Sequence, residues 1–151
     1  MNCSIESALE NRDPFDLIWA LEACFDVDRR NLEDEPNIGR RVVVTAAMFI
    51  NVFGASGYAG VIDELRLHLH LVATALEDLG LTELADNIRR INALAEARFL
   101  IAQSDEDDWS LFVAENGDFR HETQRDVPLA AALVAQALRR YIQNHPEFFV
   151  E

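Results

Sequence analysis

The stretch that decides the fold is V-V-V-T-A-A-M-F-I-N-V-F-G-A-S-G-Y-A-G-V-I, residues 42–62, which follows an arginine pair and contains no charged residue. A run of this length is long enough to cross a bilayer, and the arginines would suit its cytoplasmic flank. However, Asn51 and three glycines, Gly54, Gly57 and Gly60, interrupt it. The run exceeds an ordinary β-strand, and its alanines favour a helix. The sequence therefore predicts a buried helix over residues 40–53, followed by a glycine-rich turn.

Amphipathic helices are predicted on both sides of this stretch. Asp13 and Pro14 are typical of a helix start. Five residues then follow at three- and four-residue steps: Phe15, Ile18, Trp19, Glu22 and Phe25. All but Glu22 are apolar, which predicts that this set forms the buried face of the helix. Residues 61–79 show the clearest helical period, and Gly80 suits the position after the helix. Within them, L-R-L-H-L-H-L (65–71) alternates as a strand would, so the helix prediction is in local conflict there.

The second half of the chain predicts three more helices. Thr82 is a suitable cap for residues 83–99, and Ser104 for a helix that ends near Glu115. Pro128 is expected to begin a last long helix, which stops before Pro146. Residues 118–126 are expected to form a polar loop. The fold class predicted is therefore all-α, with residues 1–151 forming a single compact domain of about six helices in a bundle-like arrangement.

The charge of the chain excludes some kinds of partner and favours another. Twenty-seven acids and thirteen arginines give a formal net charge of −14, and there is no lysine. Direct binding to nucleic acid or to an anionic membrane is not expected, because like charges repel. Residues 1–35 hold ten acids and three arginines, and residues 104–126 hold eight acids and two arginines. Because the excess lies in these two segments, a basic protein is the expected partner.

The two cysteines and the N-terminus bear on location. Cys3 and Cys24 are too few for a disulfide scaffold, and neither has the spacing of a metal finger. Free thiols in a reducing cytoplasm are the expectation. The first ten residues lack the basic and apolar regions of a secretory signal, which also favours a cytoplasmic location.

No catalytic constellation, metal site or cofactor motif is found in the sequence. His68 and His70 are two apart and so fall on different sides of a helix. Ser56 lies in G-A-S-G, but Tyr58 stands where a nucleophile elbow requires glycine. The three glycines do not follow a predicted strand, so they do not match a dinucleotide loop. The protein is therefore expected to be non-enzymatic, with no cofactor and no metal.

The acidic residues are the candidate partner-binding residues. In S-D-E-D-D-W-S-L-F, residues 104–112, Ser104 and Asp107 have the spacing of a capping box, and Trp109 fits the inward side of the helix. Capping accounts for one or two of these acids and leaves the others unexplained. The candidates in the two acid-rich segments are Asp105, Glu106, Asp107, Asp108, Glu115, Asp118, Glu33, Asp34 and Glu35.

Two stretches, Met48–Gly57 and Tyr141–Phe149, resemble a family of small acidic all-helical bacterial proteins of the DNA-mimic type, which is related to toxin-immunity domains. The matching residues are Phe49, Phe53, Ser56, Tyr141, Ile142, His145, Pro146 and Phe149. The chain departs from the first family motif at Ala46, Ala47, Met48, Asn51 and Ala55. The resemblance implies an all-α fold and, for at least one member, a dimer whose acidic surface imitates DNA phosphates.

Two classes of function remain open at this level. The first is an acidic protein that blocks a basic protein surface, either as a DNA mimic or as an immunity protein that neutralises a toxin. The second is a helical small-molecule-binding domain or an enzyme, with a pocket near the glycine-rich turn and Tyr58. The acids are also compatible with a surface that contacts only solvent. Homodimer formation is left open; the sequence shows no coiled-coil heptads that would predict one.

Overall fold

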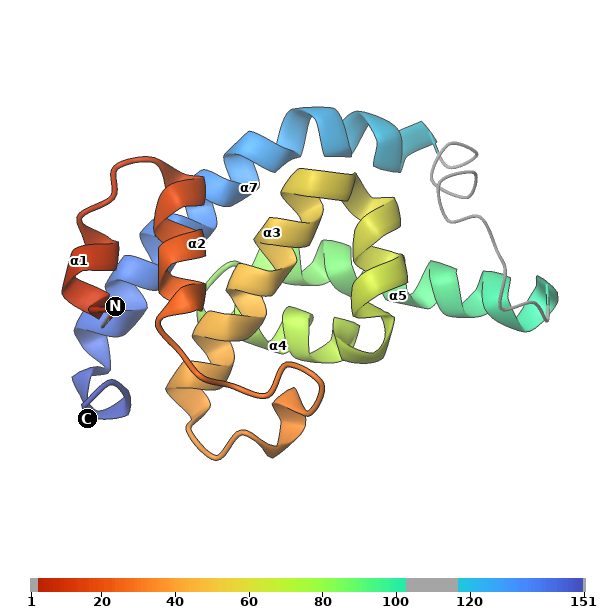
Figure 1. The fold of residues 1–151 in the computed structure, drawn as a ribbon. Helices are drawn as coiled ribbons and strands as arrows, with labels where there is room; N and C mark the ends of the chain where they lie inside the picture. Colours follow the sequence, from red (N-terminus) through yellow and green to blue (C-terminus); the bar gives the residue numbers. More distant parts are fainter. Residues whose placement is uncertain (1–2, 103–116, 151) are drawn as a thin grey trace.

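The computed structural model describes residues 3–102 and 117–150, and the side chains of residues 3–97 and 126–150. Every regular element in these described ranges is a helix, so the predicted all-α class is confirmed for them. Figure 1 shows α3 running through the middle of the molecule, with α2 and α7 beside it and α4 and α5 on another side. Both ends of the chain lie at the left of that view.

The central helix, α3, spans Ile38–Leu65 and contains the uncharged apolar stretch of residues 42–62. Its cap is Asn37, whose side-chain oxygen accepts the Arg40 N–H at 3.0 Å. Gly57 has non-helical angles (φ 63°, ψ −162°), which bend α3 sharply inside the predicted turn. Positive φ favours glycine because it lacks a Cβ. Two helical segments of α3 therefore meet at a sharp kink, and this kink lies in the predicted glycine-rich turn.

The apolar character of α3 serves a protein core. Residues 38–78 are long and apolar enough to cross a membrane by length and composition, and 56% of the apolar window is buried inside the structure. Val43, Phe49, Ile50 and Phe53 are each 1% exposed or less. The rings of Phe49 and Phe53 stack with their centroids 5.3 Å apart. The helix thus packs against protein on most of its sides, as a core helix does.

The N-terminal helices are α1, Ile5–Leu9, and α2, Pro14–Ala23. The predicted cap of α2 is confirmed, because an Asp13 carboxylate oxygen accepts the Asp16 N–H at 3.0 Å. The predicted buried face is wrong in one position, since Trp19 is 70% exposed. The face that enters the core consists of Leu17, Ile18 and Leu21. Leucines at these positions turn the helix so that Trp19 points outward.

The predicted helix over residues 61–79 is interrupted. α3 ends at Leu65, a 3-10 turn (η2) covers Arg66–His68, and α4 covers Leu69–Asp78. The interruption coincides with the alternating leucines and histidines that conflicted with the helical period. Leu65 and Leu69 remain buried on either side of the turn, whereas Leu67 is 81% exposed. The turn therefore redirects the chain while it keeps two of its leucines in the core.

The α4–α5 hairpin is closed as the sequence predicted. α5 spans Thr82–Ala102, and Gly80 (φ 80°) follows the end of α4. The Gly80 N–H donates to the Glu77 carbonyl at 2.9 Å, and the Leu81 N–H donates to the Leu76 carbonyl at 2.8 Å. These two bonds form a Schellman motif, which satisfies carbonyls at the end of the helix.

The last long helix, α7, spans Gly117–Asn144, and this corrects two predictions. Residues 118–126 are helical and not a polar loop, and Pro128 lies inside the helix and does not begin it. The segment from Phe119 to Val127 contains no glycine or proline, and its Arg, Glu and Gln residues favour a helix, so polarity alone was misleading. Pro128 removes only one N–H donor, and the helix continues through it.

The expected six helices do not correspond one to one with those observed. Residues 40–53 and the following turn belong to the single helix α3, and α1 was not expected at all. The helix predicted over residues 104–115 lies outside the described residues. Besides η2, the described chain contains two further 3-10 turns, η1 (Leu32–Asp34) and η3 (Pro146–Phe148).

The two ends of the chain are fixed to the helices of the core. The Asn37 side-chain amide donates to the Phe148 carbonyl at 2.8 Å, which joins the start of α3 to η3. The Arg139 guanidinium in α7 donates to the carbonyls of Leu9 and Asn11, and so holds the loop between α1 and α2. One cluster of buried apolar residues extends from Ala8 to Ile142.

Candidate partner-binding surface

The first group of predicted contact residues lies on η1 and at its end. Leu32 is fully buried and anchors the turn, so that Glu33 and Asp34 are exposed. Glu35 is half-buried, and its carboxylate accepts the Asn37 N–H at 3.1 Å. Glu33 Oε1 lies 3.1 Å from His70 Nε2 on α4. Of the three acids, Asp34 is thus the one with neither an ion pair nor a capping role among the described residues.

The second predicted group cannot be placed beside the first. Asp105, Glu106, Asp107, Asp108 and Glu115 lie outside the described residues, and so does the side chain of Asp118. The backbone of Asp118 is in the first turn of α7. Figure 1 shows this turn at the upper right and η1 at the lower edge of the molecule. The structure therefore does not join η1 and the start of α7 into one described surface.

Further acids in the first 35 residues are exposed, although sequence reasoning did not select them as contacts. They lie on or directly after α1, at the start of α2 and after its end, and they make no ion pair with any described residue. Together with Asp34 we call them the N-terminal acidic group, which consists of Glu6, Glu10, Asp13, Asp16, Asp26 and Asp34. Their signal in the sequence was the net charge of −7 over residues 1–35, from ten acids minus three arginines.

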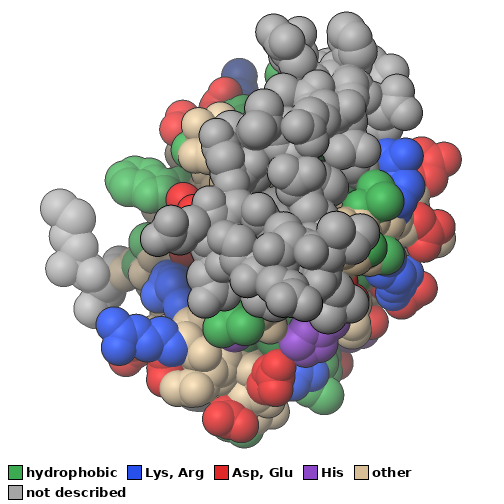
Figure 2. Space-filling model, turned by 90° about the vertical axis from the view of Figure 1, so that its right-hand side faces the viewer, with side chains coloured by type: hydrophobic (Ala, Val, Ile, Leu, Met, Phe, Trp, Pro, Cys, Tyr) green, Lys and Arg blue, Asp and Glu red, His purple; other side chains and the backbone are tan. Residues whose placement is uncertain are grey.

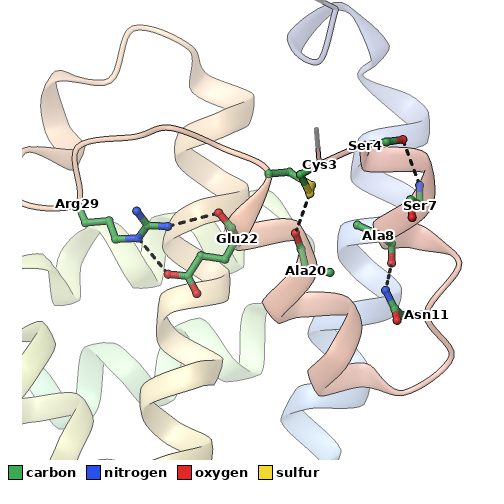
Figure 3. The surroundings of a disulfide bond; sticks show 9 residues. Cys3, Ser4, Ser7, Ala8, Asn11, Ala20, Glu22 and Arg29 are labelled. Carbon is green, nitrogen blue, oxygen red and sulfur yellow. Dashed lines mark hydrogen bonds and ion pairs between the residues drawn. A yellow bond between two sulfur atoms is a disulfide. The ribbon is translucent and has the colours of Figure 1, made fainter. Parts of the chain in front are cut away.

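One of the three arginines in residues 1–35, Arg29, is paired with an acid outside this group. Arg29 Nε lies 3.0 Å from Glu22 Oε1, and its guanidinium also donates to the Glu22 carbonyl at 3.3 Å (Figure 3). The second carboxylate oxygen of Glu22 accepts a hydrogen bond from the Asn51 side-chain amide on α3. Glu22 is half-buried, so this pairing explains how one acid is tolerated on the inner side of α2.

A second arginine of the described surface, Arg89, is also paired with acids. Arg89 on α5 lies 2.7 Å from Glu77 Oε2 and 3.3 Å from Asp86 Oδ1. These neighbours raise the pKa of Arg89, chiefly through its hydrogen bond with Glu77. On the face drawn in Figure 2, the visible acidic side chains lie beside arginines and apolar groups. That face is therefore not uniformly acidic, in contrast to the N-terminal acidic group.

The two cysteines form a disulfide, so the predicted free thiols are wrong. Cys3 precedes α1 and Cys24 is the C-terminal cap of α2, and their Cα atoms are 5.0 Å apart. Packing of α1 against α2 brings together two residues that are 21 positions apart, a proximity the spacing did not reveal. Figure 3 shows Cys3 beside α2, with its sulfur 3.6 Å from the Ala20 carbonyl oxygen.

The disulfide lies in a hollow that two members of the acidic group share. Glu6 on α1 and Asp26 after α2 line it together with Arg29 and Arg40, and its volume is about 1020 Å³. The covalent link keeps α1 against the end of α2, so it holds these two carboxylates on one side of the molecule. Because Arg29 and Arg40 also line it, the hollow itself is mixed in charge.

Asp28 shows how the loop after α2 is held. Its carboxylate accepts the Asn31 side-chain amide at 2.8 Å and the Arg30 N–H at 3.0 Å. These hydrogen bonds, with that from Asn31 the largest, hold the pKa of Asp28 below its ordinary value of 3.8. The carboxylate therefore stays charged at neutral pH and fixes the loop that leads to η1.

The residues considered for small-molecule chemistry are placed differently from the expectation. Tyr58 is 1% exposed, and its ring centroid is 4.5 Å from that of Phe53. A cavity of about 530 Å³ lies instead between the start of α5 and α7. Its polar lining includes Asn87 and Asp126, and its apolar lining residues are Leu81, Leu84, Leu129, Ala130 and Leu133. Within the described part of the chain, no group of three or more His, Cys, Asp or Glu residues is arranged to hold a metal ion.

Comparison of the chain with protein-family models, with curated proteins and with solved structures gave no match.

Proposed function

We propose that this protein is a non-enzymatic acidic protein that binds and blocks a basic protein surface, either as a DNA mimic or as an immunity protein that neutralises a toxin. The observation that carries the proposal is the N-terminal acidic group, whose exposed carboxylates make no ion pair with any described residue. Uncompensated charge of one sign attracts a partner of the opposite sign and accelerates encounter.

The other acidic segment belongs to the same proposal. Residues 104–126 carry eight acids and two arginines, a net charge of −6. Asp105, Glu106, Asp107, Asp108, Glu115 and Asp118 are retained as proposed contacts, together with Glu33 and Asp34. Glu35 is the weakest of the predicted contacts, because its carboxylate accepts a backbone N–H beside α3. Repulsion of phosphates by the net charge supports a protein partner over nucleic acid or an anionic membrane.

The proposal also covers the domain organisation, the cellular location and the oligomeric state of the protein. The buried cluster that joins α1 to α7 supports a single bundle-like domain. The cytoplasmic location remains a prediction, but the free thiols that supported it are absent, and a disulfide persists most readily in an oxidising compartment. Homodimer formation also remains a proposal, which sedimentation of the purified protein would decide.

The proposal is tested by capture of partners on immobilised protein, in a variant with neutralised acids and in a matched control. The test variant is Asp105→Asn, Glu106→Gln, Asp107→Asn and Asp108→Asn. The control neutralises four acids elsewhere, Asp63, Glu64, Asp78 and Glu83, none of which has an ion pair with a described residue. Wild type and control should retain a basic protein at low salt and release it at high salt, and the test variant should retain less.

Two results would contradict the proposal. The first is that the wild type retains no basic protein at any ionic strength. The second is that the test variant and the control lose the captured protein equally, because the effect would then follow total charge and not the acidic segment.

The cavity between α5 and α7 supports a second candidate function, a small-molecule-binding domain. Its volume of about 530 Å³ is in the range of ligand pockets, and its apolar lining with a few polar groups is typical of them. Native mass spectrometry of the purified protein tests it. A bound small molecule that is lost when Leu133 is changed to Arg would favour this candidate.

A further inference from the structure

The outer face of α2 carries an unpartnered tryptophan between acids. The exposed residues of this helix are Asp16, Trp19 and Ala23, which follow one another at three- and four-residue steps and so form a single stripe. The opposite side of α2 is occupied, since it packs against α3, α7 and α1. The stripe is thus the side of the helix that no described element covers.

The unusual feature of Trp19 is the exposure of its side chain. It is 70% exposed, whereas Leu17, Ile18 and Leu21 around it are 1% exposed or less. The indole of a tryptophan is a large apolar surface with an electron-rich face, and such side chains are enriched among the residues that dominate protein interfaces. Leaving it in water has no structural benefit, because α2 already has a complete buried face.

The charge around Trp19 specifies what could cover it. Asp16, one turn before it, is exposed and has no ion pair with any described residue, and Asp13 and Asp26 flank the helix at its two ends. Arg29, which follows α2, is engaged by Glu22 and is therefore not available to stack on the indole. A cation above an aromatic ring is attracted to its face, most strongly for tryptophan, and guanidinium does this more often than ammonium.

We propose that the Asp16–Trp19–Ala23 stripe of α2 is a docking surface for an arginine-rich segment of a protein partner. An arginine of that segment stacks on the Trp19 indole and donates to the Asp16 carboxylate, while Ala23 leaves room for its neighbouring residues. The inference rests on the proposed function and adds to it a chemical class of partner and a contact residue. It also assigns specificity, because a tryptophan between acids favours arginine over lysine.

The test measures binding of a synthetic arginine-rich peptide to purified protein at low salt, with matched lysine and glutamine peptides as comparisons. The background variant Trp109→Phe leaves Trp19 as the only tryptophan, so fluorescence reports on it alone. The arginine peptide should shift the Trp19 emission and bind more tightly than the lysine peptide. Trp19→Ala should weaken this binding about tenfold, equivalent to about 1.4 kcal/mol, and Trp19→Phe should weaken it less.

Matched variants and folding controls make the outcomes distinct. Leu67→Ala removes a comparably exposed apolar side chain on η2 and should leave binding unchanged. Circular dichroism should show unchanged helix content in the Trp19 and Leu67 variants, because both of these side chains are exposed to solvent. Asp16→Asn should reduce the preference for the arginine peptide.

Three outcomes would overturn the inference, and they differ in what they imply for the proposed function. If the peptide binds in a salt-sensitive manner and Trp19→Ala binds as the wild type does, the proposed function stands and the docking surface is wrong. If no basic peptide binds at low salt, both are wrong. If sedimentation shows a dimer that Trp19→Ala dissociates, a second copy of the chain covers Trp19 and not an arginine-rich segment.

Discussion

At the scale of single residues, the contact between the start of α3 and the C-terminal tail depends on Asn37 and Gly39. Asn37 caps α3 with its side-chain oxygen and donates its amide to the Phe148 carbonyl. Gly39, two residues further on, lets Phe148 approach, since a Cβ built on it would lie 2.3 Å from the Phe148 Cβ. The C-terminal tail is thereby fixed to the central helix by one side-chain hydrogen bond and by the absence of a side chain at Gly39.

We expect Gly39→Ala to destabilise the protein by about 1–3 kcal/mol, because the new methyl group overlaps Phe148. At an uncrowded helix position the same change would stabilise the protein by up to about 1 kcal/mol. Urea denaturation measures the difference. Gly54→Ala is the graded comparison, since its Cβ would meet only the ring edge of Phe15 at 2.8 Å, which is able to shift. An alanine at position 39 that leaves stability unchanged would contradict the contact.

A second prediction at this scale concerns Asp28. The hydrogen bond from Asn31 lowers the pKa of Asp28 in the folded protein, so the folded state favours the carboxylate. This contribution is present above the ordinary value of 3.8 and is lost as the pH falls through the lowered pKa. NMR titration should show the pKa rising towards 3.8 in Asn31→Ala. Asn11→Ala, whose amide donates to the Ala8 carbonyl instead, should leave it unchanged; equal shifts would disprove the assignment.

Among the features of single residues, the sequence could predict those that depend only on neighbouring residues, such as helix caps. The Asp13 cap and the Gly80 terminator depend on neighbours within one turn, and both are confirmed. The direction of Trp19 was wrong, because it depends on which of two overlapping apolar faces of α2 finds the core. Leu17 and Leu21 meet α3 and α7 in place of Trp19, and no local signal ranks one face above the other.

At the scale of elements, polarity and periodicity predicted helices well and their limits poorly. The long apolar stretch is a buried helix, as expected, and the kink at Gly57 lies in the predicted turn. The break at η2 and the continuation of α7 through Pro128 were not predicted. Both depend on how neighbouring helices pack, since isolated propensities favour a continuous helix at the first site and a helix start at the second.

The disulfide is the element-scale feature with the largest expected effect on stability. Because it closes a separation of 21 residues, its removal by Cys3→Ser should lower the free energy of unfolding by about 3 kcal/mol. Thermal unfolding with and without a reductant measures this, and the double variant Cys3→Ser, Cys24→Ser should no longer respond to the reductant. The bond would be refuted if the native protein reacted as two free thiols and the reductant had no effect.

Reduction should act first on α1. This helix has five residues. Apart from the disulfide, it is held by the buried Ala8, by the partly buried Ile5 and Leu9, and by the hydrogen bonds from Arg139 to the carbonyls of Leu9 and Asn11. Hydrogen exchange of the α1 amides should therefore quicken in the reduced protein, while that of α3 should change little. Equal acceleration in both helices would mean that the disulfide stabilises the whole fold and not this element.

At the scale of the whole molecule, the charge pattern is the main functional clue. The sequence showed where the acids are concentrated, but it could not show which of them are neutralised, because pairing depends on contacts between elements. Arg29 reaches back to Glu22 on α2, and Arg89 reaches across the hairpin to Glu77. None of the six carboxylates of the N-terminal acidic group makes an ion pair with a described residue, and they outnumber Arg12 and Arg30, the other two arginines of residues 1–35. This is why the described contact candidates now include residues of α1 and α2 as well as η1.

The most direct test of the account is the salt dependence of the association rate between this protein and the basic protein that it captures. The account predicts that the rate falls steeply as salt rises from about 0.05 M to about 0.5 M, because screening removes electrostatic attraction. Neutralising Asp105, Glu106, Asp107 and Asp108 should flatten this dependence, whereas neutralising Asp63, Glu64, Asp78 and Glu83 should not. A rate that does not change with salt, or one that both variants alter equally, would contradict it.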